Sequence, residues 1–331
     1  MNIYDIAERA GVSIATVSRV LNNSPNVSAK TKEKIVRVME NEGYTPNIFA
    51  RGLGLNSMKI IGVLCTDVAD IYYAKAVSVI ESSLRKHGFD SMLYCTGSDL
   101  EGKSKAMESL LSKRVDALIL VGSTFKEKED NSHIEKIAQH MPVIIINGLI
   151  ELDNTYCIIC DEYNAMVDNV CKLHAQGNTN IAYLYDVETY SSSQKLSGYK
   201  KGLEKCNLSF NKDFVIKIPL DLQTVESYVD NLLNLNPPPS AILVSEDLLA
   251  IGAIKAITKR GYQIPKDISI IGFNNSILCE CVSPTLSSID NMVEVLCSQA
   301  INTLTEVLDG KSVPDKLVIS SKLIERETFT L

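Results

Sequence analysis

The sequence has no tryptophan, only four histidines and no long apolar run. A helix that crosses a membrane needs roughly 20 consecutive apolar residues, and no stretch of the chain approaches that length. The opening residues MNIYDIAERAG carry Asp5 and Glu8 where a secretion signal would carry basic residues before an apolar segment. We therefore expect a cytoplasmic protein without a membrane partner.

Motifs for cofactors and for catalysis are also scarce. The pattern GxGxxG, which is typical of dinucleotide-binding folds, does not occur in the chain. Nine cysteines include the CxxC pair Cys157 and Cys160, but the second CxxC or the paired histidines of a zinc site are not found nearby. The histidines have no partner motif for acid–base or nucleophilic catalysis. We expect no cofactor, no metal and no enzymatic activity.

Basic residues are outnumbered in the whole chain, but not in its first part. The formal net charge is −7, whereas residues 1–59 contain eight lysines and arginines against five acidic residues. A mildly basic segment on an acidic body suggests that this segment alone contacts a polyanion. A difference of this size also arises by chance, so the charge has to be considered together with the helix pattern.

Residues 3–42 have the pattern of three short helices. Apolar residues recur at helical spacing in IYDIAERA, in ATVSRVL and in KIVRVM. Gly11 can end the first helix in a left-handed conformation, and Ser13 and Ser28 can cap the second and third helices. A helix, a glycine turn, a second helix and a supporting helix form the helix-turn-helix pattern. The sequence therefore predicts a DNA-binding head.

The second helix of this pattern carries the residues expected at DNA bases, because the first residues of a recognition helix reach base edges in the major groove. Arg19 can form a bidentate pair with guanine, whereas Ile14 and Ala15 offer only apolar contact, for example to a thymine methyl group. Short polar side chains around them suit phosphate contacts, although each is equally consistent with a helix cap or a solvated surface. The head residues predicted to bind DNA are Tyr4, Ser13, Ile14, Ala15, Thr16, Ser18, Arg19, Asn22, Asn26 and Thr31.

The pattern changes twice after the head. Residues 44–59, YTPNIFARGLGLNSMK, contain Gly52 and Gly54, each of which costs a helix about 1 kcal/mol relative to alanine, so this segment is predicted to be a linker that folds only on contact with a partner. From Lys59 onward, short β-branched runs such as KIIGVLC, DALILVG and SAILVSE alternate with helical stretches. This alternation predicts parallel sheets covered on both faces. The remaining ~270 residues exceed a single hydrophobic core, so two such units are expected.

At this point the chain resembles the lactose-repressor/galactose-repressor family of bacterial transcription regulators. The resemblance is dense in YDIAERAGVSIATVSRVLNNSPNVSAKTKEKIVRVMENEGYTPNIFARGL, and it continues more loosely through DALILVGS, SGYKKGLE, DLLAIGAIKAI, GYQIPKDISIIGF and PTLSSI. It implies an all-α helix-turn-helix head with a linker helix, joined to an α/β periplasmic-binding-protein-like body of two parallel-sheet subdomains. The expected function is transcriptional regulation, as a repressor, of a palindromic double-stranded DNA operator.

The resemblance also implies a division of the chain. The head would span residues 1–46, the linker helix 47–58 and the effector-binding, dimerising body 59–331. Within the body, a near subdomain would comprise about 60–159 and 290–318, and a far subdomain about 160–289 and 319–331, with PTLSSID as one of three crossovers. The C-terminus lacks the leucine-heptad tail of tetrameric relatives, so a homodimer is expected. In the linker, Leu53 would wedge into the minor groove, which Asn47 and Ala50 would line.

An effector is expected in the cleft between the subdomains, where ligands of open α/β sheets lie beyond the carboxyl ends of the strands. The residues predicted at those positions are Asp67, Tyr72, Tyr73, Ser123, Asn147, Asp161, Gln194, Lys195, Glu246 and Asn274. Three of them depart from the family pattern, with lysine at 195 for arginine, glutamate at 246 for asparagine and asparagine at 274 for aspartate. The effector is therefore expected to be a sugar or sugar derivative other than lactose, or the chain responds to a partner protein, as the catabolite control branch does.

Overall fold

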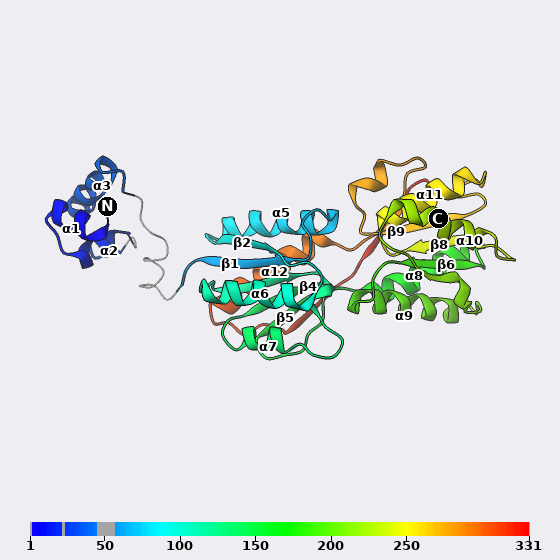
Figure 1. The fold of residues 1–331 in the computed structure, drawn as a ribbon, viewed down its shortest axis with the longest axis horizontal. Helices are drawn as coiled ribbons and strands as arrows, with labels where there is room; N and C mark the ends of the chain where they lie inside the picture. The colour runs from blue at the N-terminus through cyan, green and yellow to red at the C-terminus, as the bar shows by residue number, and fades with distance from the viewer. Residues whose placement is uncertain (1, 22–23, 45–56, 331) are drawn as a thin grey trace.

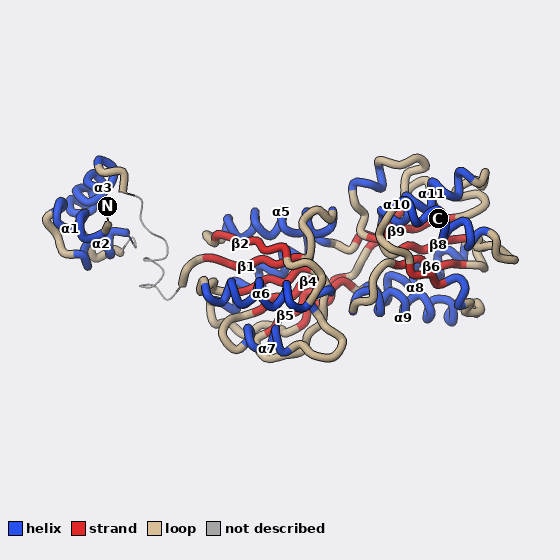
Figure 2. The backbone as a smooth tube through the Cα atoms, in the orientation of Figure 1, coloured by secondary structure: helices blue, strands red, loops and turns tan. Residues whose placement is uncertain are grey.

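The computed structural model describes residues 2–21, 24–44 and 57–330 (Figures 1 and 2). The head is the separate helical unit at the N-terminal end of Figure 1. It consists of α1 (Ile3–Ala10), α2 (Ile14–Leu21) and α3 (Ala29–Asn41), as the apolar spacing predicts. Gly11 ends α1 with a left-handed φ of 58°, which costs glycine little because it has no Cβ.

Seven buried apolar side chains form the core of the head. They come from all three helices and repeat at the spacing that places them on one face of each helix. These residues are Ile6, Ala7, Ala10, Val17, Val20, Ile35 and Met39. Their packing leaves the opposite face of α2 exposed to solvent.

The near sheet of the body has six parallel strands in the order β11-β5-β4-β3-β1-β2. Its strands are β1 (Ile60–Cys65), β2 (Asp90–Cys95), β3 (Ala117–Val121), β4 (Val143–Ile146), β5 (Thr155–Cys160) and β11 (Lys316–Ile319). One face is covered by α5 (Ile71–Lys86) and α12 (Val293–Leu308), and the other by α6 (Leu100–Ser112) and α7 (Ser132–Ala138).

The far sheet also has six strands, in the order β12-β10-β9-β8-β6-β7, and only β12 runs antiparallel to its neighbour. Its strands are β6 (Ile181–Tyr185), β7 (Val215–Lys217), β8 (Ala241–Val244), β9 (Ser269–Phe273), β10 (Ser287–Asp290) and β12 (Lys322–Ile324). One face is covered by α8 (Glu162–Ala175) and α9 (Tyr190–Lys205), and the other by α10 (Leu222–Leu233) and α11 (Asp247–Lys259). The predicted fold class is therefore confirmed.

Three short 3₁₀ helices, η1 (Ser123–Phe125), η2 (Lys212–Phe214) and η3 (Ile277–Glu280), complete the described elements. Among the described residues, no helix is long and apolar enough to cross a membrane.

The pattern of apolar residues does not predict β10, β11 and β12. In β10 the serines at 287 and 288 are fully buried, because Ser287 Oγ donates to the carbonyl of Phe329 (2.8 Å) and Ser288 Oγ donates to Asp247 Oδ1 (2.6 Å). The edge strand β11 alternates exposed and half-buried residues. PTLSSID was expected to be a crossover, and this expectation is wrong for its last four residues, which belong to the far sheet and precede the crossing at residues 291–292.

Candidate functional site

The exposed face of α2 carries the residues expected at DNA bases. Ile14 is 41% exposed although it is a large apolar residue, and Ala15 and Arg19 are exposed beside it, while Val17 and Val20 are buried. A solvated isoleucine at the start of a helix is available for apolar contact with a partner. The structure therefore presents the three predicted base-reading side chains together on one surface.

The short polar residues of the head divide into helix caps and exposed groups. Ser13 Oγ accepts from the amide of Thr16 (3.2 Å) and lies 2.9 Å from its hydroxyl, and the same arrangement joins Ser28 to Thr31. Tyr4, which is 65% exposed, and Asn26 point to solvent.

The other residues predicted to bind DNA are either half-buried or not among the residues that the structure describes. Ser18 and Thr31 are half-buried. Asn22, Asn47, Ala50 and Leu53 lie outside the described residues, so their predicted DNA contacts stay predictions.

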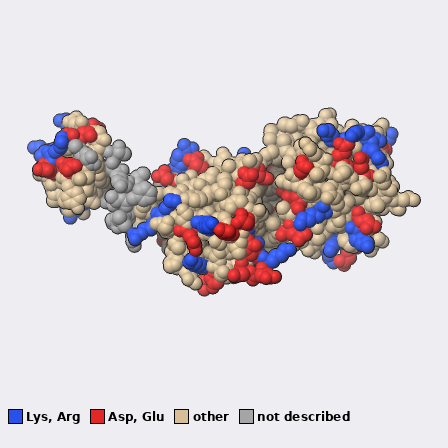
Figure 3. All heavy atoms as spheres, in the orientation of Figure 1, with Lys and Arg blue, Asp and Glu red and all other residues tan. Residues whose placement is uncertain are grey.

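Charge on the head is mixed rather than uniformly basic. On the face shown in Figure 3, basic and acidic side chains lie side by side on the head. Arg9 pairs with Glu42, and Arg37 Nη2 lies 2.8 Å from Glu33 Oε1 on α3. Each such pair reduces the positive charge that these arginines can offer to a polyanion.

The body contains a cavity of about 320 Å³ between its two sheets. Six of its lining residues each follow directly on the last residue of a strand, three from each sheet: Thr66, Gly122, Asn147, Asp186, Ser245 and Asn274. The carboxyl ends of the two parallel sheets therefore face each other across this space, which we call the cleft cavity.

Eight of the ten predicted effector residues line the cleft cavity: Asp67, Tyr72, Tyr73, Ser123, Asn147, Lys195, Glu246 and Asn274. Asp161 and Gln194 do not line it, and their prediction as lining residues is not supported. The Asp161 carboxylate instead caps α8 by accepting from the amide of Asn164 (3.1 Å). Gln194 precedes Lys195 on α9, and one residue on a helix turns the side chain by about 100°.

The two neighbouring tyrosines differ in their surroundings. Their rings meet edge to face with centroids 5.4 Å apart. Tyr73 lies across Gly122, where an added Cβ would come within 2.7 Å of its hydroxyl, and that hydroxyl lies 3.4 Å from Thr124 Oγ1. The hydroxyl of Tyr72 is buried without a hydrogen-bond partner. Tyr73 therefore requires glycine at 122, because that position brings backbone and ring into contact.

Lys195 is held in a buried ion pair at the floor of the cavity. Its side chain is almost fully buried, and its Nζ lies 3.7 Å from Glu162 Oε1. The Nζ also donates to the carbonyl of Ser245 (3.3 Å) and lies 3.8 Å from the centre of the Phe273 ring. A buried lysine with this set of partners is fixed in position.

Glu162 was not predicted from the sequence, although it stands beside the predicted Asp161. It is only 2% exposed and accepts from Ser191 Oγ (2.6 Å) and from Asn147 Nδ2 (3.2 Å). The run CIICDE places two acids after a buried strand, and this signal does not say which of the two points inward. Glu162 connects the near side, through Asn147, with the far side, through Ser191 and Lys195.

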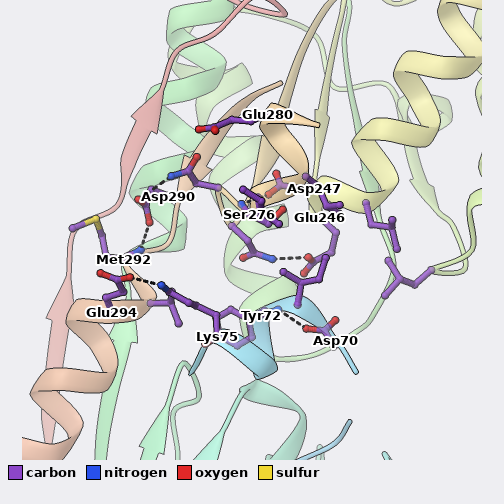
Figure 4. A pocket seen from close by; sticks show the side chains of 18 of the residues that line it. Asp70, Tyr72, Lys75, Glu246, Asp247, Ser276, Glu280, Asp290, Met292 and Glu294 are labelled. Carbon is purple, nitrogen blue, oxygen red and sulfur yellow. Dashed lines mark hydrogen bonds and ion pairs between the residues drawn. The ribbon is translucent and has the colours of Figure 1, made fainter. Parts of the chain in front are cut away.

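Glu246 stands between the cleft cavity and a second pocket of about 800 Å³ that extends toward the crossovers (Figure 4). Asn274 Nδ2 donates to its Oε2 (2.5 Å). Burial, with the nearby carboxylates Asp186 and Asp70, raises the pKa of Glu246 well above its ordinary value, and Lys195 opposes this only in part. Burial also raises the pKa of Asp70.

The larger pocket has a polar rim on the side of the crossovers. Figure 4 shows Lys75 of α5 pointing toward Glu294 of α12, and their charged atoms are 2.5 Å apart. Met292, between β10 and α12, has a left-handed φ of 58°. Asp290 Oδ1 accepts from its amide (2.7 Å), which holds the chain where it passes between the two sheets.

Residues 97–104, GSDLEGKS, match the spacing GxxxxGK[ST] of a phosphate-binding loop. The structure does not build such a loop here. Asp99 caps α6 and accepts from the amide of Gly102 (2.8 Å), so the helix begins before the glycine and lysine of the motif. Lys103 is 2% exposed and donates to the carbonyl of Thr124 (2.6 Å) and to Glu127 (2.7 Å). The lysine stabilises the loop after β3 and is not free for a phosphate.

Within the described residues, no three His, Cys, Asp or Glu side chains gather closely enough to hold a metal ion. The acidic side chains of the cleft cavity are thus spread around it rather than collected at one point.

Comparisons with known proteins match both parts of the chain. The family model of bacterial regulatory proteins of the lacI family matches residues 2–47, and that of the periplasmic binding protein-like domain matches residues 170–329. An HTH-type transcriptional regulator of Lachnoclostridium phytofermentans is 50% identical over 99% of both chains. Catabolite control protein A of Priestia megaterium is 29% identical over 96% of both. The Lac repressor dimer bound to operator and the anti-inducer ONPF superimposes with a TM-score of 0.88 at 27% identity, covering 99% of this chain and 98% of that one.

Proposed function

Because the chain belongs to the lacI family of bacterial regulatory proteins and is a DNA-binding transcriptional regulator, we propose that it represses transcription under the control of a small effector bound in the cleft cavity. The observation that carries this proposal is the cavity itself, in which strand ends of both sheets converge on a space lined by polar residues. A space of about 320 Å³ lies within the range of small-molecule sites. The proposed effector is a sugar or a sugar derivative.

Operator recognition is proposed to involve a homodimer in the cytoplasm. The Lac repressor of the solved complex is a dimer on its operator, and two symmetric heads read two half-sites of a palindrome about one helical turn apart. Residues 1–46 would form the head, 47–58 the linker and 59–331 the body. Ile14, Ala15 and Arg19 would then read bases, since they are exposed together on α2.

Coupling between effector and operator requires that the effector contact both sides of a movable junction. A chain of hydrogen bonds from the cleft cavity meets this requirement. Asn274 donates to Glu246 (2.5 Å) and accepts from Asn291 Nδ2 (2.7 Å), and Asn291 Oδ1 accepts from the amide of Val293 (3.1 Å). Val293 begins α12, which packs on the near sheet. A ligand that holds Glu246 therefore acts on the crossover between the two subdomains.

The experiment that tests this function uses the full chain and DNA selected from a random-sequence pool. We expect a mobility shift with one palindromic sequence at physiological salt, and a small molecule from a panel of sugars and their derivatives should alter it. An Arg19→Ala variant serves as the control for sequence-specific binding. Failure to retain any duplex at low salt would contradict the proposal. An operator complex that responds only to a partner protein would instead support the catabolite-control type of regulation.

A further inference from the structure

We infer that the effector carries a protonated amine on a hydroxyl-rich scaffold, as an amino sugar does. This inference rests on the proposed function and specifies the ligand class of the cleft cavity. It comes from the balance of charge and hydrogen-bonding groups around that cavity.

Carboxylates outnumber cations in the lining. Among the described residues that line the cleft cavity, the acids are Asp67, Asp70, Asp186 and Glu246, whereas Lys195 is the one cation. The charge of Lys195 is already matched by Glu162, which lies behind it at 3.7 Å. No lysine or arginine among the described lining residues therefore remains to balance the charge of these four acids.

Each of these acids uses one oxygen within the protein, and Asp67 Oδ1 accepts from the amide of Ala69 (2.9 Å). Asp70 Oδ1 accepts from the amides that begin α5 (2.8 and 3.1 Å), Asp186 Oδ1 accepts from Ser245 Oγ (3.0 Å), and Glu246 Oε2 accepts from Asn274 (2.5 Å). Each of these bonds fixes the position of a carboxylate and occupies one of its two oxygens. A partly buried, uncompensated carboxylate is unfavourable, and a ligand cation removes that cost while an anionic ligand increases it.

The raised pKa values of Glu246 and Asp70 agree with this arrangement. Each carboxyl gains affinity for a proton because burial and like charges disfavour its ionised form. A protonated amine offers the same positive charge and two or three donors, so it would take the place of the bound proton. A neutral hydroxyl offers a single donor and no charge.

The rest of the lining selects between kinds of cation. A metal ion is not indicated, because the described acids do not come together as ligands of one ion. In the part of the chain that the structure describes, eight serine and threonine residues line the cavity, whereas only Val187 and Leu220 are aliphatic. A hydroxyl-rich ring satisfies such a surface, whereas the methylene chain of an aliphatic diamine would leave its polar groups unpaired.

The test measures binding to the full chain by thermal shift and calorimetry, with matched ligands that differ at one nitrogen. The panel contains glucosamine, galactosamine and mannosamine, their parent hexoses, their N-acetyl forms, glucosamine 6-phosphate, the polyamino sugar kanamycin and the diamine putrescine. We expect at least one amino sugar to bind at least tenfold more tightly than its neutral counterparts. Equal or tighter binding of a neutral or phosphorylated sugar, preference for putrescine, or no amine-dependent binding across the panel would overturn the inference.

Substitutions of lining acids test whether the preference for an amine arises in the cleft cavity. Glu246→Gln keeps an oxygen for Asn274 and Asp186→Asn keeps one for Ser245, so each removes charge with little change of shape. We expect each to weaken the amino sugar at least tenfold and its neutral parent by less than threefold. Asp168→Asn, an exposed charge on α8, is the matched control and should leave both affinities unchanged. Equal losses for the amine and its parent would count against a charge-based contact.

Operator binding is measured separately on the same preparations. A chain that binds its operator and is released by a neutral sugar keeps the proposed function while the amine inference fails. A chain that binds no DNA contradicts the proposed function whatever ligand the cavity takes.

Discussion

The head and the cleft cavity present their recognition residues in opposite ways. In the head, Ile14, Ala15 and Arg19 are exposed within one and a half turns of a single helix, and the groups that hold that helix are its immediate neighbours. In the cavity, Lys195 and Glu162 are buried on α9 and α8, and their partners Asn147 and Ser245 follow strands of the near and the far sheet. A change in the head should therefore alter recognition without affecting the fold, whereas a change in the cavity should alter both.

The largest effect is expected from Lys195→Met, which leaves Glu162 buried without its cation. Breaking a buried pair by removing one partner costs about 3–5 kcal/mol, so the urea midpoint of the body should fall clearly. The double variant Lys195→Met/Glu162→Gln should recover most of the loss. Lys201→Met, which removes an exposed pair with Glu204, should change stability by less than about 1 kcal/mol. An equal loss in the Lys195 and Lys201 variants would remove the contrast between the two regions.

The next effect concerns the head alone. Arg19→Ala should weaken binding to the selected operator by about 1–3 kcal/mol per half-site, measured by fluorescence anisotropy, while effector binding in the body stays unchanged. Arg37→Ala is the control, because this arginine is paired with Glu33 on α3 and should matter only through salt-dependent attraction. Uniform weakening of Arg19→Ala across all DNA sequences would show that Arg19 contacts phosphates and not bases.

A smaller effect is expected on the coupling between the cleft cavity and operator binding by the head. Asn274→Ala interrupts the hydrogen bonds from Glu246 to Asn291, so we expect it to lower the effect of the effector on operator affinity by about 0.5–2 kcal/mol. Operator affinity without effector should remain as in the wild type. Asn302→Ala on the exposed face of α12 is the matched control. If the effector changes the operator affinity of the Asn274 variant as much as that of the wild type, these hydrogen bonds do not transmit the effect of the effector.

In the head, Ser28→Ala should cost about 1 kcal/mol, because it removes the cap of α3. Faster hydrogen exchange of the α3 amides is the measurement, with Lys30→Ala as control. The same exchange in both variants would mean that the cap does not stabilise this helix.

The smallest effect is a pH dependence confined to the body. The raised pKa of Glu246 means that the folded chain binds a proton at this site more readily than the unfolded chain. The unfolding free energy should therefore fall as pH rises from the ordinary carboxyl range of about 4.3 through the raised pKa. Urea midpoints between pH 5 and 7 should show this decline in the wild type and a flatter profile in Glu246→Gln. Parallel profiles would contradict it.

The head could be predicted almost completely because its structure is local. Gly11, Ser13 and Ser28 act within three or four residues of their own positions, and those distances can be read from the chain. The apolar spacing of the three helices identifies their buried faces for the same reason.

The cleft cavity could be predicted only in part. Strand ends indicate which residues reach the cavity edge, and this placed Asn147 and Asn274 correctly among the lining residues. The sequence does not show which of the two neighbouring acids, Asp161 or Glu162, points inward. In the structure Asp161 caps α8, whereas Glu162 accepts hydrogen bonds from Asn147 and Ser191. Residues 97–104 match the spacing of a phosphate-binding loop, and only the buried contacts of Lys103 with Thr124 and Glu127 show that this lysine is not free for a phosphate.

The sequence by itself determined the helices of the head, the alternation of strands and helices in the body, and the family. Only the tertiary structure decided which charges are paired. Lys195 meets Glu162 across 33 positions of the chain, and the carboxylates of Asp70, Asp186 and Glu246 line one cavity from three separate loops. Helix and strand periodicity are properties of neighbouring residues, whereas the charge balance of a cavity depends on side chains that become neighbours only when helices and loops far apart in the chain pack together.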